Sequence, residues 1–261
     1  YNRLPSAIAK LAFCADHIND CFEAMDLMKN YHANSIIICM GKAGFITRVL
    51  AKKFGSLVTY AGLDDENFTA PGQITIDKLK NIYRWGNINS GTQIFGLIGN
   101  PVEHSISPQL YNESFSQMEM NALYLPFMVE GDQMQFDEFM DNILIRGKFG
   151  FGGFSVTIPH KAHALAYALA KGEFVEQLAD EIGAVNTLKI GYNGLVSAYN
   201  TDYAGAMDAL VKAMSIDRHR LHQYKTAVIG AGGAARAVVS ALTRYGSRSE
   251  EHTSELQSPN T

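Results

Sequence analysis

The stretch Phe154-Ser155-Val156-Thr157-Ile158-Pro159-His160-Lys161 has the pattern of a strand that turns into a helix. A β-prone run ends at Pro159, and an Ala- and Leu-rich run, which we expect to be helical, follows over residues 162–170. Such a corner exposes the Thr157 hydroxyl, the backbone and the Lys161 ammonium together. It predicts an α/β fold with a polar site here. The alternative is that Pro159 only ends a strand and Lys161 is a solvated helix residue.

Two further polar clusters are candidates to converge on this corner. They are Ser105-Ile106-Ser107-Pro108 and the combination of Asn186-Thr187 with Asn200-Thr201-Asp202. With the corner they supply hydroxyls, amides, one cation and one carboxylate. A pocket of this composition suits a small polyhydroxylated acid.

The composition excludes several classes of protein. A chain of 261 residues, 47% of them hydrophobic, is long enough for roughly two domains of ~100–200 residues each. Its net charge of −4 offers no basic surface for nucleic acid or a membrane. No apolar run approaches the ~20 residues of a membrane span. We therefore expect small-molecule substrates and neither a nucleic-acid nor a membrane partner.

The cysteines bear on compartment and metal content. Cys14, Cys21 and Cys39 contain no C-x-x-C pair. This spacing argues against a disulfide framework or a zinc site and fits a reducing compartment. We expect a cytoplasmic protein without a metal. Because the chain begins at Tyr1, a lost upstream targeting segment leaves a plastid location open.

Residues 1–85 alternate between strand and helix patterns. The predicted strands are 7–13, 35–40 and 57–61, and the predicted helices are 16–29, 45–54 and 76–85. This βα repeat is typical of a parallel sheet or barrel. Lys10 interrupts the first apolar strand, where desolvation would lower its pKa and free the amine for a Schiff base. The alternative is a snorkelling lysine at a strand end.

Four motifs in this region carry a resemblance. They are Ala9-Lys10, Met40-Gly41-x-x-Gly44-x-x-Thr47-Arg48, Phe54-Gly55-Ser56-x-x-Thr59-Tyr60 and Thr69-Ala70-Pro71-Gly72-Gln73. They resemble the C-terminal part of type I 3-dehydroquinate dehydratase, a (β/α)8 barrel with a Schiff-base lysine. The resemblance implies that Lys10 is this lysine and that Arg48, Thr69 and Gln73 contact 3-dehydroquinate. The family's catalytic histidine and glutamate have no matching segment. Since only about three βα units are present, we expect open strand edges and an open apolar interior.

A second domain is predicted over residues 92–221, after a polar linker at 86–91. Its motifs are Gly96-x-x-Gly99-Asn100-Pro101-x-x-His104-Ser105-x-Ser107-Pro108, the Ser155–Lys161 corner, Gly183-Ala184-Val185-Asn186-Thr187 and Asn200-Thr201-Asp202. In this order they closely resemble shikimate dehydrogenase. The resemblance implies that Ser105 and Ser107 bind the substrate carboxylate.

The same resemblance assigns the remaining polar residues. It implies that Thr157, Asn186 and Asp202 hold ring hydroxyls, and that Lys161 and Asp202 form the catalytic pair. The residue types agree with this chemistry. Reducing the ketone of 3-dehydroshikimate to shikimate needs a hydride from a nicotinamide and a proton on the developing alkoxide. A positioned lysine stabilises that oxyanion and delivers the proton, and a nearby aspartate orients the lysine.

Residues 222–246 read as the start of a truncated Rossmann domain. An apolar strand at 225–229 runs into Gly230-Ala231-Gly232-Gly233-Ala234, and a helix is expected to continue to residue 243. This is G-x-G-x-x-A between a strand and a helix, the context of a dinucleotide site. The alternative is a tight βα turn. The family implies NADP, and NAD is not excluded, because the strand end that selects between them lies beyond this segment.

Residues 247–261 have neither a helical nor a strand period. They resemble the translation of a common sequencing adapter, and we expect this tail to be non-native and without a role in the fold; the alternative is a disordered polar terminus.

We interpret the chain as a fragment of a fused dehydratase–shikimate dehydrogenase of aromatic amino-acid biosynthesis, and we expect the fragment itself to be inactive. One alternative is a quinate/shikimate dehydrogenase that uses NAD. Another is a non-catalytic module that binds a shikimate-like metabolite. Lys161 and Asp202 argue against the module, since binding alone needs no acid–base pair.

Overall fold

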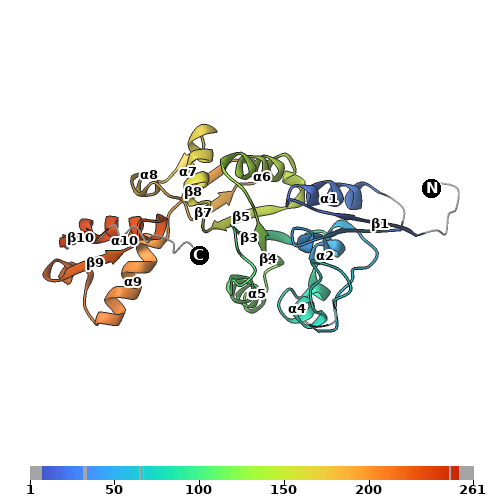
Figure 1. Cartoon of the computed structure of the whole chain (residues 1–261), viewed down its shortest axis with the longest axis horizontal. Helices are drawn as coiled ribbons and strands as arrows, with labels where there is room; N and C mark the ends of the chain where they lie inside the picture. Colours follow the sequence, from blue (N-terminus) through green and yellow to red (C-terminus); the bar gives the residue numbers. More distant parts are fainter. Residues whose placement is uncertain (1–7, 32–33, 65, 67, 247, 253–261) are drawn as a thin grey trace, which may run out of the picture. The chain divides into compact units, whose positions relative to one another are not determined.

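The computed structural model describes residues 8–31, 34–64, 66, 68–246 and 248–252 (Figure 1). The chain divides into two compact units. The first holds the residues up to His160 together with Lys189–Leu195, and the second holds Lys161–Leu188 and the residues from Val196 onward. The division between the units thus falls at the strand-to-helix corner, inside the predicted 92–221 domain.

The N-terminal part of the first unit contains two parallel strands and four short helices. Its elements are β1 (Ala9–Cys14), α1 (Asp20–Asn30), β2 (Ser35–Met40), α2 (Phe45–Val49), α3 (Ala51–Phe54), α4 (Ile76–Asn81) and the 3-10 turn η1 (Trp85–Asn87). β1 and β2 are parallel, with Lys10 opposite Ile36. Helix α1 buries its apolar face, including Phe22 and Met25, which is the 3.6-residue periodicity expected from the sequence.

Three predictions in this part are wrong in detail. Residues 57–61 form no strand, and only Gly62 makes a β-bridge, to Thr75. The predicted 45–54 helix is interrupted at Leu50, and the last helix ends at Asn81. Leu57 and Val58 are 46% and 39% exposed. Within the described chain β1 and β2 form a sheet of two strands, so no further strand encloses these apolar side chains.

The rest of the first unit is a parallel sheet covered by helices. It contains β3 (Gln93–Gly99), α5 (Ser107–Gln117), β4 (Ala122–Met128), α6 (Gln133–Ile145), the 3-10 turn η2 (Gly147–Phe149) and β5 (Phe151–Val156). β3 lies between β4 and β5 and is parallel to both. Figure 1 shows α5 and α6 on opposite faces of these strands. The predicted α/β class is confirmed.

The second unit begins with α7 (Lys161–Ala170). It continues with β6 (Phe174–Val175), α8 (Gln177–Ile182), β8 (Val196–Tyr199), α9 (Asp202–Met214), the 3-10 turn η3 (Arg218–Gln223), β9 (Lys225–Ile229) and α10 (Gly233–Arg244). β7 (Thr187–Ile190) precedes β8 and is its neighbour. Helices α9 and α10 share a buried cluster that includes Tyr203, Met207 and Leu242. The starts of α7, α9 and α10 all lie in this unit.

The tail differs from the expectation that it has no fold role. Arg248–His252 forms strand β10, which is parallel to β9 and pairs Arg248 with Lys225. A β-ladder is made by backbone groups, so a segment without an apolar period can still add a strand. Residues 247 and 253–261 lie outside the described part of the chain.

Candidate active site

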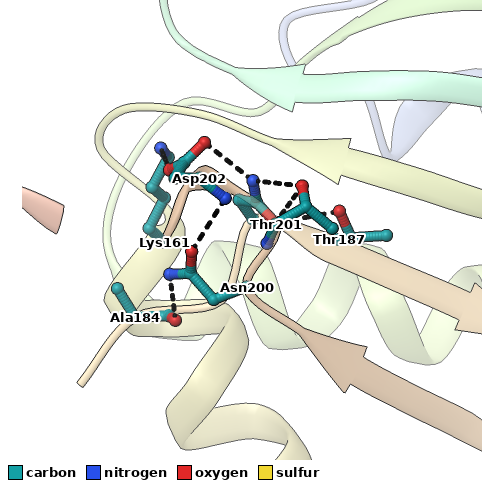
Figure 2. Close-up of polar contacts among 7 residues, drawn as sticks. Lys161, Ala184, Thr187, Asn200, Thr201 and Asp202 are labelled. Atoms are coloured by element: carbon teal, nitrogen blue, oxygen red, sulfur yellow. Dashed lines mark hydrogen bonds and ion pairs between the residues drawn. The ribbon is translucent and has the colours of Figure 1, made fainter. Parts of the chain in front are cut away.

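Lys161 and Asp202 are the first residues of two helices in the same unit. Lys161 opens α7 and Asp202 opens α9. The Lys161 ammonium Nζ donates a hydrogen bond to Asp202 Oδ2 and forms an ion pair with it (Figure 2). The side chains are 17% and 30% exposed. The pair is therefore sheltered but open to a small molecule, and the ammonium has further N–H donors to offer.

Asn186 holds the carboxylate side of this pair. Its Nδ2 donates to Asp202 Oδ1 at 2.8 Å and to Thr201 Oγ1 at 2.9 Å. Its Oδ1 accepts from the Thr201 backbone N–H and from Thr187 Oγ1, both at 2.9 Å. Every polar atom of this buried amide is thus engaged, so its rotamer is fixed. Asp202 is held through both of its oxygens, by Lys161 on one and Asn186 on the other.

Asn200 fixes the turn that precedes Asp202. The side chain is 3% exposed. Its Oδ1 accepts from the Asp202 N–H at 3.0 Å, and its Nδ2 donates to the Ala184 carbonyl at 2.8 Å. The Asn200 N–H donates to Glu176 Oε2 at 3.0 Å. The sequence pointed to Asn200 as part of a polar cluster but gave it no role, and it gave no signal for Glu176.

The glycine-rich turn lies against the Lys161 side chain. Helix α10 starts at Gly233, and Gly230 has φ +123°. A Cβ added at Gly233 would lie 3.2 Å from Lys161 Cδ and 3.2 Å from Ala184 Cβ. Glycine at this position therefore lets the start of α10 approach the Lys161 stem closely. Gly230, Ala231 and Gly232 are exposed, and no side chain caps the first turn of α10.

The predicted carboxylate-binding serines lie on the loop after β3. Ser105 is half-buried and its Oγ accepts from the Ser107 N–H at 3.2 Å at the start of α5. Thr157 follows β5, the strand next to β3, and its N–H donates to the Ile98 carbonyl at 2.8 Å. Because neighbouring parallel strands end at the same edge of a sheet, these hydroxyls belong to one edge of the first unit.

Lys10 is not in the environment predicted for it. It is exposed, and its Nζ lies 4.5 Å from the centroid of the Tyr60 ring. The expectation of a desolvated lysine is therefore wrong for this chain. β1 pairs only with β2 in the described part of the chain, and Leu11 beside Lys10 is 48% exposed. Its proposed Schiff-base role stays a prediction.

Arg48 is deeply buried, in contrast to Lys10. Its side chain lies in α2 and is 2% exposed, and burial lowers its pKa. Its Nε has no hydrogen-bond partner among the residues that the structure describes. A buried guanidinium donor without a partner is costly and fits a site that receives an anion.

Thr69 and Gln73 bond to one another and line a cavity. The Thr69 N–H donates to Gln73 Oε1 at 2.8 Å, and Gln73 Nε2 donates to Thr69 Oγ1 at 3.0 Å. The cavity has a volume of about 780 Å³ and also borders Ser105. It thus brings together residues that the two resemblances assigned to different substrates. Lys10 and Arg48 are absent from its described lining.

No cluster of metal-ligating side chains and no helix able to cross a membrane occurs in the described ranges of the chain.

Two families match separate parts of the chain. Residues 2–90 match the type I 3-dehydroquinase family, and residues 97–188 match the shikimate dehydrogenase substrate binding domain. The first match ends inside the predicted linker at 86–91, and the second begins six residues after its end.

Whole proteins with similar sequences contain one or both parts. The bifunctional 3-dehydroquinate dehydratase/shikimate dehydrogenase, chloroplastic, of Arabidopsis thaliana is 32% identical over 251 residues, 92% of this chain and 40% of that protein. The shikimate dehydrogenase (NADP(+)) of Caldanaerobacter subterraneus subsp. tengcongensis is 41% identical over 160 residues, 61% of this chain and 52% of that protein. The chain therefore spans about half or less of these relatives.

A solved structure supports the fold. A shikimate dehydrogenase in complex with NADP+ matches with a TM-score of 0.52 and 36% identity, covering 63% of this chain and 51% of that one. Residues 2–90 are accordingly similar to the type I 3-dehydroquinase family, and residues 97–188 are similar to the substrate binding domain of shikimate dehydrogenase.

Proposed function

We propose that the intact protein is a bifunctional enzyme that reduces 3-dehydroshikimate to shikimate with NADPH and carries a 3-dehydroquinate dehydratase part. The observation that carries the proposal is the Lys161–Asp202 pair, fixed by Asn186 and lying beside the glycine-rich turn at Gly233. An ammonium aimed by a carboxylate next to a dinucleotide motif is the arrangement that a ketone reduction requires.

The reduction follows from the geometry of these residues. When bound, NADPH would supply the hydride for the reduction. Lys161 donates a proton to the oxygen as negative charge develops there, and Asp202 keeps the ammonium oriented. We assign Asn186 and Thr157 to the ring hydroxyls. Ser105 and Ser107 hold the substrate carboxylate, since their loop presents hydroxyls beside the first turn of α5.

The residues present fit a dinucleotide. The exposed backbone from Gly230 to Gly232 allows a pyrophosphate to approach, and the uncapped first turn of α10 offers N–H donors around Gly233 and Ala234. NADP is proposed because the curated relative named above and the solved structure are an NADP(+) enzyme and an NADP+ complex.

The dehydratase part rests on Arg48. We assign its unpartnered Nε to the carboxylate of 3-dehydroquinate, and Thr69 and Gln73 to the hydroxyls, although Arg48 is 2% exposed and does not border the cavity that Thr69 and Gln73 line. We assign the Schiff base to Lys10. We also propose that the intact protein is located in the cytoplasm or in a plastid. The plastid is included because the similar Arabidopsis protein is named as chloroplastic.

The test uses the full-length protein. We expect NADPH oxidation that depends on 3-dehydroshikimate, and we expect Lys161→Ala to abolish it while shikimate still binds in calorimetry. A wild-type protein that binds shikimate but never reduces the ketone would favour the metabolite-binding module instead. The other alternative is a quinate/shikimate dehydrogenase that uses NAD. Comparing kcat/KM for shikimate with NADP and for quinate with NAD tests it.

A further inference from the structure

The N-terminal segment contacts α6, η2 and β5 through aromatic rings. The Phe22 ring of α1 lies 5.8 Å from the Phe139 ring and 6.3 Å from the Phe151 ring, measured between centroids. The Phe54 ring of α3 lies 4.6 Å from that of Phe149. All five side chains are buried. Without the segment, the aromatic side chains of β5, η2 and α6 would be exposed to water.

A buried lysine crosses the same contact. Lys53 of α3 is 7% exposed. Its Nζ donates to the Thr92 carbonyl at 2.6 Å and to the Ser90 carbonyl at 3.0 Å, both just before β3. A Cβ added at Gly150, just before β5, would lie 3.6 Å from this nitrogen. Burying an amine is costly unless it is hydrogen-bonded, and these acceptors come from the other side of the contact.

Charged groups surround the aromatic rings. Arg146, at the end of α6, places Nη2 2.8 Å from Asp26 Oδ2, and its guanidinium lies 5.2 Å from the centroid of the Phe22 ring. Lys29 Nζ donates to the Lys148 carbonyl at 3.0 Å. An apolar centre with a polar rim is the anatomy of a specific interface between folded parts.

The linker itself is held by the lysine next to Lys53. Lys52 Nζ donates to the Gly86 carbonyl at 2.5 Å and lies 5.6 Å from the centroid of the Trp85 ring. Trp85 is the single tryptophan of the chain. Both ends of the linker are thus bonded to α3, and tryptophan fluorescence reports on this junction.

We propose that the dehydratase-like segment has a structural role separate from any dehydration: it is the docked cover of β5, η2 and α6. Lys53 is the positioning residue, because its Nζ bonds α3 to the linker at Ser90 and to Thr92 just before β3. Within the first unit, the dehydratase-like segment and the residues from 92 to 160 then form one rigid body, not two domains on a flexible tether.

The experiment is hydrogen exchange on the 261-residue chain in increasing urea. The Gln93 and Ile94 amides, bonded to the Asn121 and Gly150 carbonyls, report on the start of β3, and the β2 amides report on the segment. In the wild type we expect both sets to exchange in one shared opening event. Lys53→Met should speed exchange at Gln93 and Ile94 by about tenfold or more and lower the urea midpoint of Trp85 fluorescence.

Lys80→Met, on an exposed position of α4, is the matched control and should change neither readout. Separate opening events in the wild type, or unchanged exchange in Lys53→Met, would overturn the proposal.

A milder variant covers the case in which Lys53→Met fails to fold. Asp26→Asn removes the ion pair with Arg146 at a position 37% exposed, and should speed the same exchange by about two- to fivefold. The control is Asp77→Asn on α4, which removes a carboxylate whose hydrogen bond comes from Asn81 of the same helix. Equal exchange rates at Gln93 and Ile94 in the two aspartate variants would also contradict the proposal that the segment is a docked cover.

Discussion

Lys10 and Lys161 were both predicted to be catalytic, and the structure gives them different surroundings. Lys161 is 17% exposed and pairs with Asp202, which Asn186 holds in turn. Lys10 is exposed on a strand with one neighbour. The difference teaches that a site built from helix starts within one compact unit is formed in this chain, whereas a site inside a barrel depends on the strands that close the barrel.

The largest expected effect tests the Lys161 half of this comparison. In the full-length enzyme, Lys161→Ala should lower kcat for ketone reduction by about 10²–10⁴-fold, because general-acid catalysis is lost. Steady-state NADPH oxidation measures it. Lys171→Ala, just past the end of α7, should retain wild-type kcat. A loss of less than tenfold in Lys161→Ala would remove Lys161 from the catalytic role.

A third lysine, Lys53, has the burial that the sequence predicted for Lys10. It therefore tests how burial changes the pKa of a lysine in this chain. Burial, reinforced by the charge of Lys29, lowers the pKa of Lys53 to about 8 from its ordinary 10.5. The unfolded amine keeps its proton up to the higher value, so folding releases a proton between pH 8 and 10.5. The free energy of unfolding should therefore rise with pH in this window, by up to about 3 kcal/mol.

The measurement is the difference in unfolding free energy between wild type and Lys53→Met from pH 7 to 10.5. Tyr83 and Tyr124, whose pKa values burial raises, are present in both proteins, so their contributions cancel. A pH-independent difference would show that Lys53 is not desolvated.

Asn186 tests whether the Lys161 site is preformed. Asn186→Ala deletes the donors to Asp202 and Thr201 and should cost about 0.5–1.5 kcal/mol, the net value of ordinary hydrogen bonds, since these acceptors are only partly buried. Urea unfolding of the chain measures this loss. Asn193→Ala, in the exposed turn before β8, should cost much less. Equal costs for the two variants would mean that the network adds no stability.

Gly233 tests the contact between the glycine-rich turn and Lys161. Gly233→Ala places a methyl group 3.2 Å from Lys161 Cδ and should cost about 1 kcal/mol through overpacking. Gly232→Ala is the matched control, because an added Cβ there meets no described atom within 4 Å. Thermal unfolding of both variants decides the point, and equal Tm values would argue against the close approach.

The smallest expected effect concerns Lys10. Lys10→Met removes a cation over the Tyr60 ring at an exposed site, and should change the unfolding free energy by about 0.5 kcal/mol or less. A loss above 2 kcal/mol would show that Lys10 is buried after all. The surroundings of Lys10 and Lys161 would then be similar.

Local sequence determined many of the regular elements and the helix starts that carry Lys161 and Asp202. The predicted strands 35–40 and 225–229 coincide with β2 and β9. Pro and Gly patterns predicted where strands end. Lys161 and Asp202 are the first residues of the helices α7 and α9. These features follow from steric preferences of the nearby backbone and from side-chain periodicity, which short stretches already contain.

Tertiary structure alone decided burial and partners. It left 57–61 without a strand, exposed Lys10, buried Lys53 against carbonyls 37 and 39 residues away, and left Arg48 Nε without a partner in the described chain. It also paired the tail with β9. The physical reason is that desolvation depends on which distant segments cover a residue, and the local pattern around Lys10 or Lys53 contains no information about that cover.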